Sequence, residues 1–195
     1  IMARPEFFPR PWAVALLAFS GTMGLGDASL LRDAADANDP AAVAAAIKAG
    51  ADVNEFGADG VSILTHSTTA RKFKAVNALL RAGADPNLGN RDTGRTAMHL
   101  AALSGDASLV KWLIKKGLQK SPVDHEGLTP LHCACQGSQK GNTDAAWALL
   151  DAGVAPDEPS TDGTRPIEFA RANDSTRKLL QEMLAEKARS QRRAQ

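Results

Sequence analysis

The sequence of 195 residues contains no tyrosine, few other aromatic residues and almost no net charge. Aromatic side chains make up 5% of the chain, so a folded core has to be built mainly from alanine, leucine and valine. The formal net charge is +1, which argues against a nucleic-acid-binding protein that relies on an overall positive charge. We therefore expect no nucleic-acid partner.

Cysteine is equally scarce, and the chain has two such residues, Cys133 and Cys135. They are two positions apart, so on a helix their side chains point to different sides and do not easily form a disulfide with each other. His132 precedes them, but no second pair of ligands follows at the spacing of a zinc site. We expect structural thiols, no metal, and a reducing intracellular compartment.

The apolar, uncharged run at residues 12–25 has 14 residues, too few to span a bilayer, which takes about 20. It begins with Trp12, and an arm rich in proline and phenylalanine, with Phe7 and Phe8, precedes it. Three interpretations of residues 1–26 stay open: an arm that docks on a partner or a membrane surface, a capping helix that packs on the rest of the chain, or the signal peptide of an exported protein. We prefer the docking arm, which implies a membrane-associated protein inside a cell or an organelle.

What the sequence does contain is an internal repeat. Residues 49–54, Ala-Gly-Ala-Asp-Val-Asn, recur as Ala-Gly-Ala-Asp-Pro-Asn at residues 82–87. Weaker copies follow at Gly117 and Gly153, so that the glycine steps are 33, 34 and 36 residues. A second glycine series runs in parallel: Gly60, Gly94, Gly127 and Gly163. A fixed period of this length indicates stacked units, none of which buries its apolar face alone.

A helix-starting motif follows the second glycine series. Residues 127–134 read Gly-Leu-Thr-Pro-Leu-His-Cys-Ala, and residues 94–102 read Gly-Arg-Thr-Ala-Met-His-Leu-Ala-Ala. Residues 60–67 and 163–170 are degraded copies of the same motif. Threonine can cap a helix, and proline suits the first helical position, where its missing N–H is not needed. Each motif therefore predicts the start of a helix.

In its period and in these two motifs, the chain resembles an ankyrin-repeat protein from about Asp27 to Leu184. The resemblance implies an all-α solenoid of about five helix-turn-helix units with β-hairpin finger loops, the first and last units acting as caps. We expect three parts: the arm and short helix at 1–26, the repeat domain at 27–185 and a basic tail at 186–195. We expect the helix pairs at about 28–49, 62–82, 96–116, 129–152 and 165–186.

Two repeats depart from the regular pattern. The second has Thr65 where the motif has histidine, so we expect its local hydrogen bonds to differ. The fourth is three residues longer between its helices, around Gln136-Gly137-Ser138. We expect that stretch, continuing to Gly141 and Asn142, to be a mobile loop.

The sequence shows no arrangement of catalytic residues. The resemblance gives His99 and His132 a structural role, because this histidine orders the backbone between ankyrin repeats. The triplet Asp124-His125-Glu126 looks reactive but falls at a hairpin tip, where solvated charge is ordinary. There is no phosphate-binding glycine loop and no pair of carboxylates in a plausible cleft. We expect neither an enzyme nor a cofactor.

Ankyrin-repeat proteins recognise other proteins through their hairpin tips and the concave face of their inner helices. Carried onto this sequence, and joined by the arm, the resemblance predicts the following partner-binding residues: Phe7, Phe8, Trp12, Glu55, Phe56, Val61, Thr69, Asn90, Arg91, Arg95, Leu103, Ser104, His125, Glu126 and Leu128. Phe56 has two interpretations, because an aromatic residue at a turn either anchors a partner or folds back onto the neighbouring repeat.

Two functions of different kinds are consistent with these features. The first is a non-catalytic, peripheral or structural subunit of a larger, membrane-bound assembly, whose protein partners hold the arm and whose residues 12–25 contact the membrane or a membrane protein. The second is a stand-alone adaptor or inhibitor that binds one protein through its concave face. An enzyme is a distant third.

Overall fold

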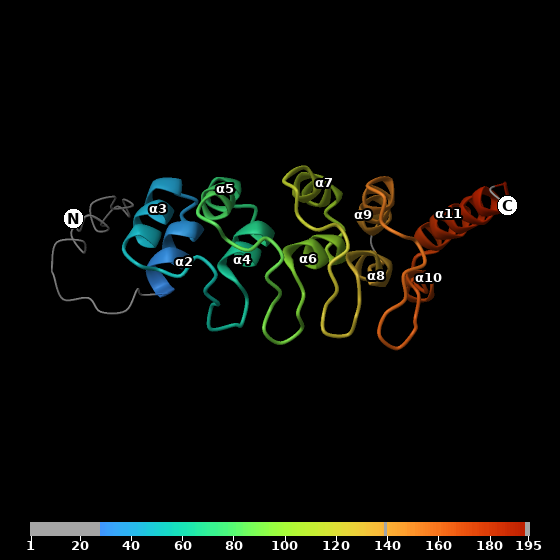
Figure 1. Ribbon diagram of the computed structural model, residues 1–195, viewed down its shortest axis with the longest axis horizontal. Helices are drawn as coiled ribbons and strands as arrows, with labels where there is room; N and C mark the ends of the chain where they lie inside the picture. Colours follow the sequence, from blue (N-terminus) through green and yellow to red (C-terminus); the bar gives the residue numbers. More distant parts are fainter. Residues whose placement is uncertain (1–27, 139, 194–195) are drawn as a thin grey trace, which may run out of the picture.

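The computed structural model describes residues 28–138 and 140–193, which form a single row of stacked helix pairs (Figure 1). The pairs are α2 (Ala28–Asp36) with α3 (Pro40–Lys48), α4 (Ile63–Thr69) with α5 (Phe73–Arg81), α6 (Ala97–Leu103) with α7 (Ala107–Lys115), α8 (Pro130–Gln136) with α9 (Lys140–Asp151), and α10 (Pro166–Phe169) with α11 (Asp174–Arg193). This part of the chain has no strand beyond an isolated bridge between Phe56 and Ser62. The predicted all-α repeat solenoid is confirmed. The arm at 1–26, with Phe7, Phe8 and Trp12, lies outside the described residues.

The helices form two layers. The inner layer contains α2, α4, α6, α8 and α10, and the outer layer contains α3, α5, α7, α9 and α11. Four long loops leave the outer helices and project beyond the inner layer before the chain enters the next inner helix (Figure 1). The glycines that end the first four outer helices have φ between 81° and 105°, a region in which other residues are strained.

Side chains of one repeat cap or anchor the backbone of the next. The Oδ1 atom of Asn38 accepts hydrogen bonds from the N–H groups of Lys74 and Ala75 at 3.1 Å, which caps α5 from the preceding repeat. The two Asp-x-Asn segments work in the same way. Asn54 accepts from Asp85 N–H at 2.8 Å, and Asn87 accepts from Gln119 N–H at 3.2 Å. Each repeat therefore fixes the position of its successor.

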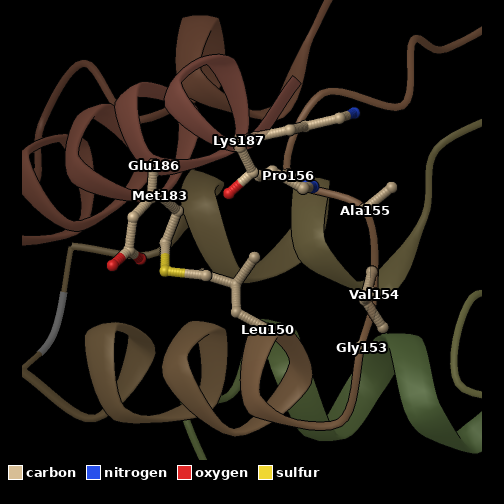
Figure 2. A pocket seen from close by; sticks show the side chains of 9 residues that line it. Leu150, Gly153, Val154, Ala155, Pro156, Met183, Glu186 and Lys187 are labelled. Carbon is tan, nitrogen blue, oxygen red and sulfur yellow. The ribbon is translucent and has the colours of Figure 1, made fainter. Parts of the chain in front are cut away.

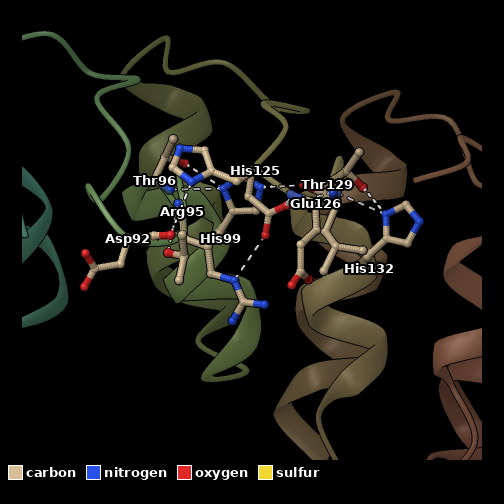
Figure 3. A network of polar contacts seen from close by, with 11 residues as sticks. Asp92, Arg95, Thr96, His99, His125, Glu126, Thr129 and His132 are labelled. Carbon is tan, nitrogen blue, oxygen red and sulfur yellow. Dashed lines mark hydrogen bonds and ion pairs between the residues drawn. The ribbon is translucent and has the colours of Figure 1, made fainter. Parts of the chain in front are cut away.

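The motif histidines make a second link between repeats (Figure 3). The Nδ1 atom of His99 accepts from Thr96 N–H at 3.1 Å, and its Nε2 atom lies 2.9 Å from the carbonyl oxygen of Leu128 in the next repeat. His132 repeats this arrangement with Thr129 at 3.0 Å and with the carbonyl oxygen of Thr164 at 3.2 Å. Both imidazoles are fully buried, and burial lowers the pKa of each. They order the backbone between repeats, as the resemblance implied.

The second repeat lacks this link. Thr65 is buried in the place of the histidine, and Ser62 caps α4 by accepting from Thr65 N–H at 3.2 Å. The next residue, His66, instead contacts the first repeat: its Nε2 lies 2.8 Å from Asp36 Oδ1 and its Nδ1 lies 3.2 Å from the guanidinium of Arg32. The histidine of the second repeat therefore bonds to the preceding repeat, whereas His99 and His132 bond to the following one.

The buried apolar side chains fall into two clusters. One extends from Leu31 to Ala84, through the first two repeats, and the other extends from Met98 to Leu180, through the last three. Trp112 packs against both, and its ring lies 4.8 Å from that of Phe73 across the junction. In Figure 1, α5 and α7 are more widely spaced than α3 and α5 or α7 and α9. Two aromatic rings therefore fill the junction where the core divides.

The longer fourth repeat differs from its prediction. Gly141 and Asn142 lie in the first turn of α9 rather than in a mobile loop, and Asn142 is 1% exposed. Its Nδ2 atom donates to the carbonyl oxygens of Ala102 at 3.1 Å and Leu103 at 2.9 Å, which satisfies the end of α6. This tight packing leaves no room for a side chain at Gly141, where a Cβ would lie 2.5 Å from Gly105 O.

The end of the chain also differs. Helix α11 continues to Arg193, so the predicted domain boundary at 185 falls inside a helix. Lys187, which the sequence placed in the basic tail, donates to the carboxylate of Asp157 at 2.6 Å. This contact ties the first turn of the predicted tail to the loop before α10 and lowers the pKa of Asp157.

We predict that Leu113→Ala destabilises the fold by about 2–5 kcal/mol, because this fully buried leucine joins α7 to its neighbours in the larger cluster. Since stacked repeats share interfaces, the loss should weaken the adjacent units as well. Chemical denaturation followed by circular dichroism measures the change. A loss below about 1 kcal/mol would show that Leu113 is not a core position.

We also predict that the free energy of unfolding decreases as the pH falls below the pKa that the two buried histidines have in the unfolded chain. Their folded-state pKa values are depressed, so the unfolded chain binds more protons below its own pKa of about 6.5. The contribution of the two neutral imidazoles to the free energy of unfolding is therefore fully present above that pH, and it is lost as the pH falls. Urea denaturation at pH 7 and pH 5 should show a smaller pH-dependent loss for the His99→Gln/His132→Gln variant than for the unsubstituted chain. Equal losses would contradict this assignment.

Candidate functional site

The loop tips form a continuous row because each tip donates a backbone hydrogen bond to the tip before it. Arg91 N–H donates to Gly60 O at 3.0 Å, His125 N–H to Thr93 O at 2.9 Å, and Thr161 N–H to Glu126 O at 3.1 Å. Bonds between backbone atoms hold the tips in a fixed register, whatever their side chains are. We call this series of four loops, residues 55–61, 88–95, 122–128 and 158–164, the tip row.

Close approach between tips requires glycine at one side. A Cβ on Gly94 would lie 2.5 Å from the ring of His125, and Gly94 has a φ of +71°. His125 in turn stands over the preceding tip, with Nδ1 3.2 Å from Asp92 O (Figure 3). Gly127 has the same role at the next contact, where a Cβ would lie 2.3 Å from Thr161 Oγ1.

A buried ion pair joins the second and third loops of the tip row. The carboxylate of Asp124, with 2% of its side chain exposed, accepts from Arg95 Nε at 3.2 Å. It also accepts from Glu126 N–H at 3.0 Å and Leu128 N–H at 2.9 Å. A buried charge with this many donors has a fixed geometry. Asp124 therefore holds its own tip and anchors the arginine of the tip before it.

Phe56 lies under the next tip rather than free in solvent. It is half-buried, and the guanidinium carbon of Arg91 sits 4.5 Å from the centre of its ring. This is the interpretation in which Phe56 folds onto the neighbouring repeat. The cation–π contact leaves part of the ring, and an exposed arginine, on the same surface.

The other predicted partner-binding residues are distributed unevenly. The exposed residues are Thr69, Arg91, Ser104, His125 and Glu126, and the half-buried residues are Glu55, Phe56, Val61, Asn90, Arg95 and Leu103. Leu128 is 3% exposed and belongs to the interior. Its N–H donates to Asp124 and its carbonyl oxygen accepts from His99, so the backbone is held close to the preceding repeat and the side chain turns inward.

A polar cluster at the first repeat was not predicted from the sequence. Arg32 on α2 pairs with Asp59 of the first tip at 3.0 Å, and this arginine lowers the pKa of the Asp59 carboxyl. His66 on α4 bonds to Asp36, which lies on α2 together with Arg32. The sequence gives little indication of these contacts, because the residues lie 27 to 34 positions apart and no motif links them.

Chemistry at the remaining candidates is limited by burial. Burial raises the pKa of Cys133 and Cys135 to about 12, so both thiols stay protonated and unreactive at neutral pH.

Within residues 28–138 and 140–193, no group of three histidine, cysteine or acidic side chains is arranged to hold a metal ion. Across those same residues, no helix has the length and apolar character needed to cross a membrane.

An open groove of 430 Å³ lies at the far end of the array, between the end of α9 and the side of α11 (Figure 2). Leu150, Val154 and Met183 form its apolar walls, and Glu186 and Lys187 stand at its edge. Lys187 is paired with Asp157, so the groove offers apolar contact beside the carboxylate of Glu186.

Two exposed apolar residues do not belong to the predicted partner-binding set. Val123 is 58% exposed at the third tip, and Trp147 is 49% exposed on α9. The helical spacing of apolar residues in α9 could have indicated that Trp147 is exposed. The buried face of α9 carries Ala145, Ala146, Leu149 and Leu150, and Trp147 falls between these positions.

Comparison with known proteins agrees with this geometry. The sequence profile of ankyrin repeats (three copies) matches residues 30–124, 70–162 and 101–190. Human protein phosphatase 1 regulatory subunit 27 is 39% identical over 77 residues, which cover 40% of this chain and 48% of that protein. The chain thus spans about half the length of this curated relative.

Two further relatives match over shorter shares of their length. Inhibitor of Apoptosis OPG037 of variola virus is 37% identical over 71 residues, 36% of this chain and 14% of that protein. The mouse inhibitor of Bruton tyrosine kinase is 35% identical over 77 residues, 39% of this chain and 6% of that protein. The profile covers most of the described helices, and the helix pairs, linking histidines and tip row have the same period, so the chain belongs to the ankyrin-repeat family.

Proposed function

We propose that this protein is a non-catalytic binding subunit that holds a protein partner against its tip row and the exposed ends of its inner helices. The observation that carries the proposal is the chain of backbone hydrogen bonds from tip to tip. A surface fixed before binding loses little conformational freedom when a partner docks, so more of the contact energy is available for affinity.

The chemistry of this surface is mixed. Arg91, His125 and Glu126 are exposed on successive tips, and Val123 adds an exposed apolar side chain. Thr69 and Ser104 are exposed at the ends of α4 and α6. Opposite charges beside apolar contacts favour a folded protein partner with a complementary mixed surface over a uniformly charged polymer.

The names of the relatives support binding as the function. One is named a regulatory subunit of a protein phosphatase and another an inhibitor of a tyrosine kinase, so both names describe action on another protein, and the third is named an inhibitor of apoptosis. They favour a regulator that binds one partner. Membership of a larger, membrane-bound assembly rests on the pattern of residues 1–26, and it remains the second form of the proposal.

The first test exchanges charges on two tips without altering the net charge. Arg91→Glu/Glu126→Arg should weaken binding of the partner by roughly tenfold or more, because both exposed side chains face it. The matched control, Lys178→Glu/Glu182→Lys, makes the same exchange on the exposed side of α11 and should leave binding unchanged. Affinity capture with mass spectrometry identifies the partner, and titration of the purified pair measures the change.

The result that would contradict the proposal is equal retention of the partner by the tip variant and the unsubstituted chain. Purified protein phosphatase 1 is a defined candidate for the titration, given the name of the relative. Failure to bind that phosphatase alone would remove one partner, whereas insensitivity of the captured partner to the tip variant would remove the site.

A second test concerns residues 1–26. Deleting them should leave the circular dichroism spectrum of the repeats unchanged and release the protein from its complex or membrane fraction. Three aromatic residues in one short segment, Phe7, Phe8 and Trp12, would be a liability for association if no other surface covered them. Unfolding of the shortened chain would identify the segment as an intramolecular cap. Full retention in the complex would place all docking in the repeats.

A further inference from the structure

The small net charge conceals a strong separation of charge along the chain. Residues 61–120 contain ten lysines and arginines against three acidic residues, a net charge of +7. The flanking segments are acidic, with a net charge of −4 for residues 28–60 and −5 for residues 121–165. The second and third repeats are therefore a positive block between two negative ones.

The cations of this block divide between the two layers. Two near the inner layer form ion pairs: Arg95 pairs with Asp124, and Arg71 pairs with Asp106. Five on the outer helices α5 and α7 and directly after α7 are exposed: Lys74, Arg81, Lys111, Lys115 and Lys116. None of these five forms an ion pair with another residue in the described part of the chain. Unpaired charge of one sign is thus concentrated on the outer layer.

Aromatic rings lie among these cations. The ammonium group of Lys116 sits 5.3 Å from the centre of the Trp112 ring, and that of Lys111 sits 5.9 Å from the centre of the Trp147 ring. Trp112 and Phe73 fill the junction between α5 and α7, and Trp147 stands half-exposed on the next outer helix. Lysine and tryptophan side by side offer charge and apolar contact to the same ligand.

We propose that this basic outer surface, made of the five cations with Trp112 and Trp147, binds an acidic polypeptide segment that carries an apolar anchor residue. Carboxylates of the segment pair with the lysines, and the anchor covers Trp147. The surface lies on the outer layer, away from the tip row, so it is a second binding site and goes beyond the function proposed above.

The charges around Trp147 favour a narrow peptide over an anionic membrane. Asp144 and Asp151 are exposed three residues before and four residues after it, on the same side of α9. A flat bilayer that buried Trp147 would bring both carboxylates close to lipid phosphates, which costs free energy. An extended segment along α5 and α7 reaches the lysines and places one side chain on Trp147 without covering the two aspartates.

The experiment uses the full chain and a fluorescein-labelled synthetic peptide of alternating glutamate and leucine, with binding followed by fluorescence anisotropy. Lys111→Glu/Lys115→Glu/Lys116→Glu should weaken binding by roughly tenfold or more, and Trp147→Ala by about threefold or more. The control Arg189→Glu/Arg192→Glu/Arg193→Glu changes net charge equally on an exposed part of α11 and should stay within about twofold of the unsubstituted chain.

Three results would overturn the proposal. The first is no binding of the peptide by the unsubstituted chain. The second is an equal loss in the control, which would mean that net charge alone attracts the peptide. The third is binding to vesicles that contain phosphatidylserine with no binding to the peptide. Circular dichroism checks that each variant is folded, and Lys111→Glu alone replaces the triple variant if that variant unfolds.

The same titration separates this surface from the tip row. Arg91→Glu/Glu126→Arg should bind the acidic peptide as well as the unsubstituted chain does, because those side chains lie on the tips. If that variant also lost the peptide, the acidic segment would belong to the tip row, and the basic outer surface would have no role in binding it.

Discussion

Everything in this molecule depends on the fact that a single repeat has too little apolar surface to fold alone. A helix pair of about 20 residues buries its leucines and alanines only when another pair stacks on it. Such an array needs its neighbours to be placed accurately, and here polar side chains do this. Asn38, Asn54 and Asn87 reach forward to cap or anchor the next unit, and His99 and His132 bond to the carbonyl oxygens of the next tip. The stacking and these bonds together fix the tip row.

The features that repeat could be predicted from the sequence, and those that depend on contacts between unlike repeats could not. The two glycine series and the helix-starting motif, intact in two repeats and degraded in two, predicted the helix pairs of repeats two to five, because each acts within its own unit. Gly141 and Asn142 read as a loop because their composition favours one, yet Asn142 satisfies carbonyl groups of α6, a partner 39 positions away. The same limit applies to Leu128. Its place in the motif indicated the binding face, whereas its hydrogen bonds to neighbouring residues turn it inward.

The two layers of the array have different chemistry. On the inner side, several charges form internal ion pairs, such as Arg95 with Asp124 and Arg32 with Asp59, which stiffen the tips. On the outer side of the second and third repeats, the lysines have no such partners among the described residues. The sequence shows that charge is separated along the chain, although the sum is close to zero. The structure adds that five cations of the positive block, unpaired among the described residues, lie on its outer helices or directly after them.

The division of the core at Trp112 also has a consequence for the mechanics of the chain. In a linear array, cooperative folding passes from unit to unit only as strongly as the weakest interface allows. The apolar core divides between the second and third repeats, where the Phe73–Trp112 ring pair and the inner helices make the apolar contact. Heat or force applied to the ends should therefore separate the protein into a short segment of two repeats and a long segment of three. Amide protons in the last three repeats should exchange with solvent more slowly than those in the first two, because the larger cluster opens as a unit of its own.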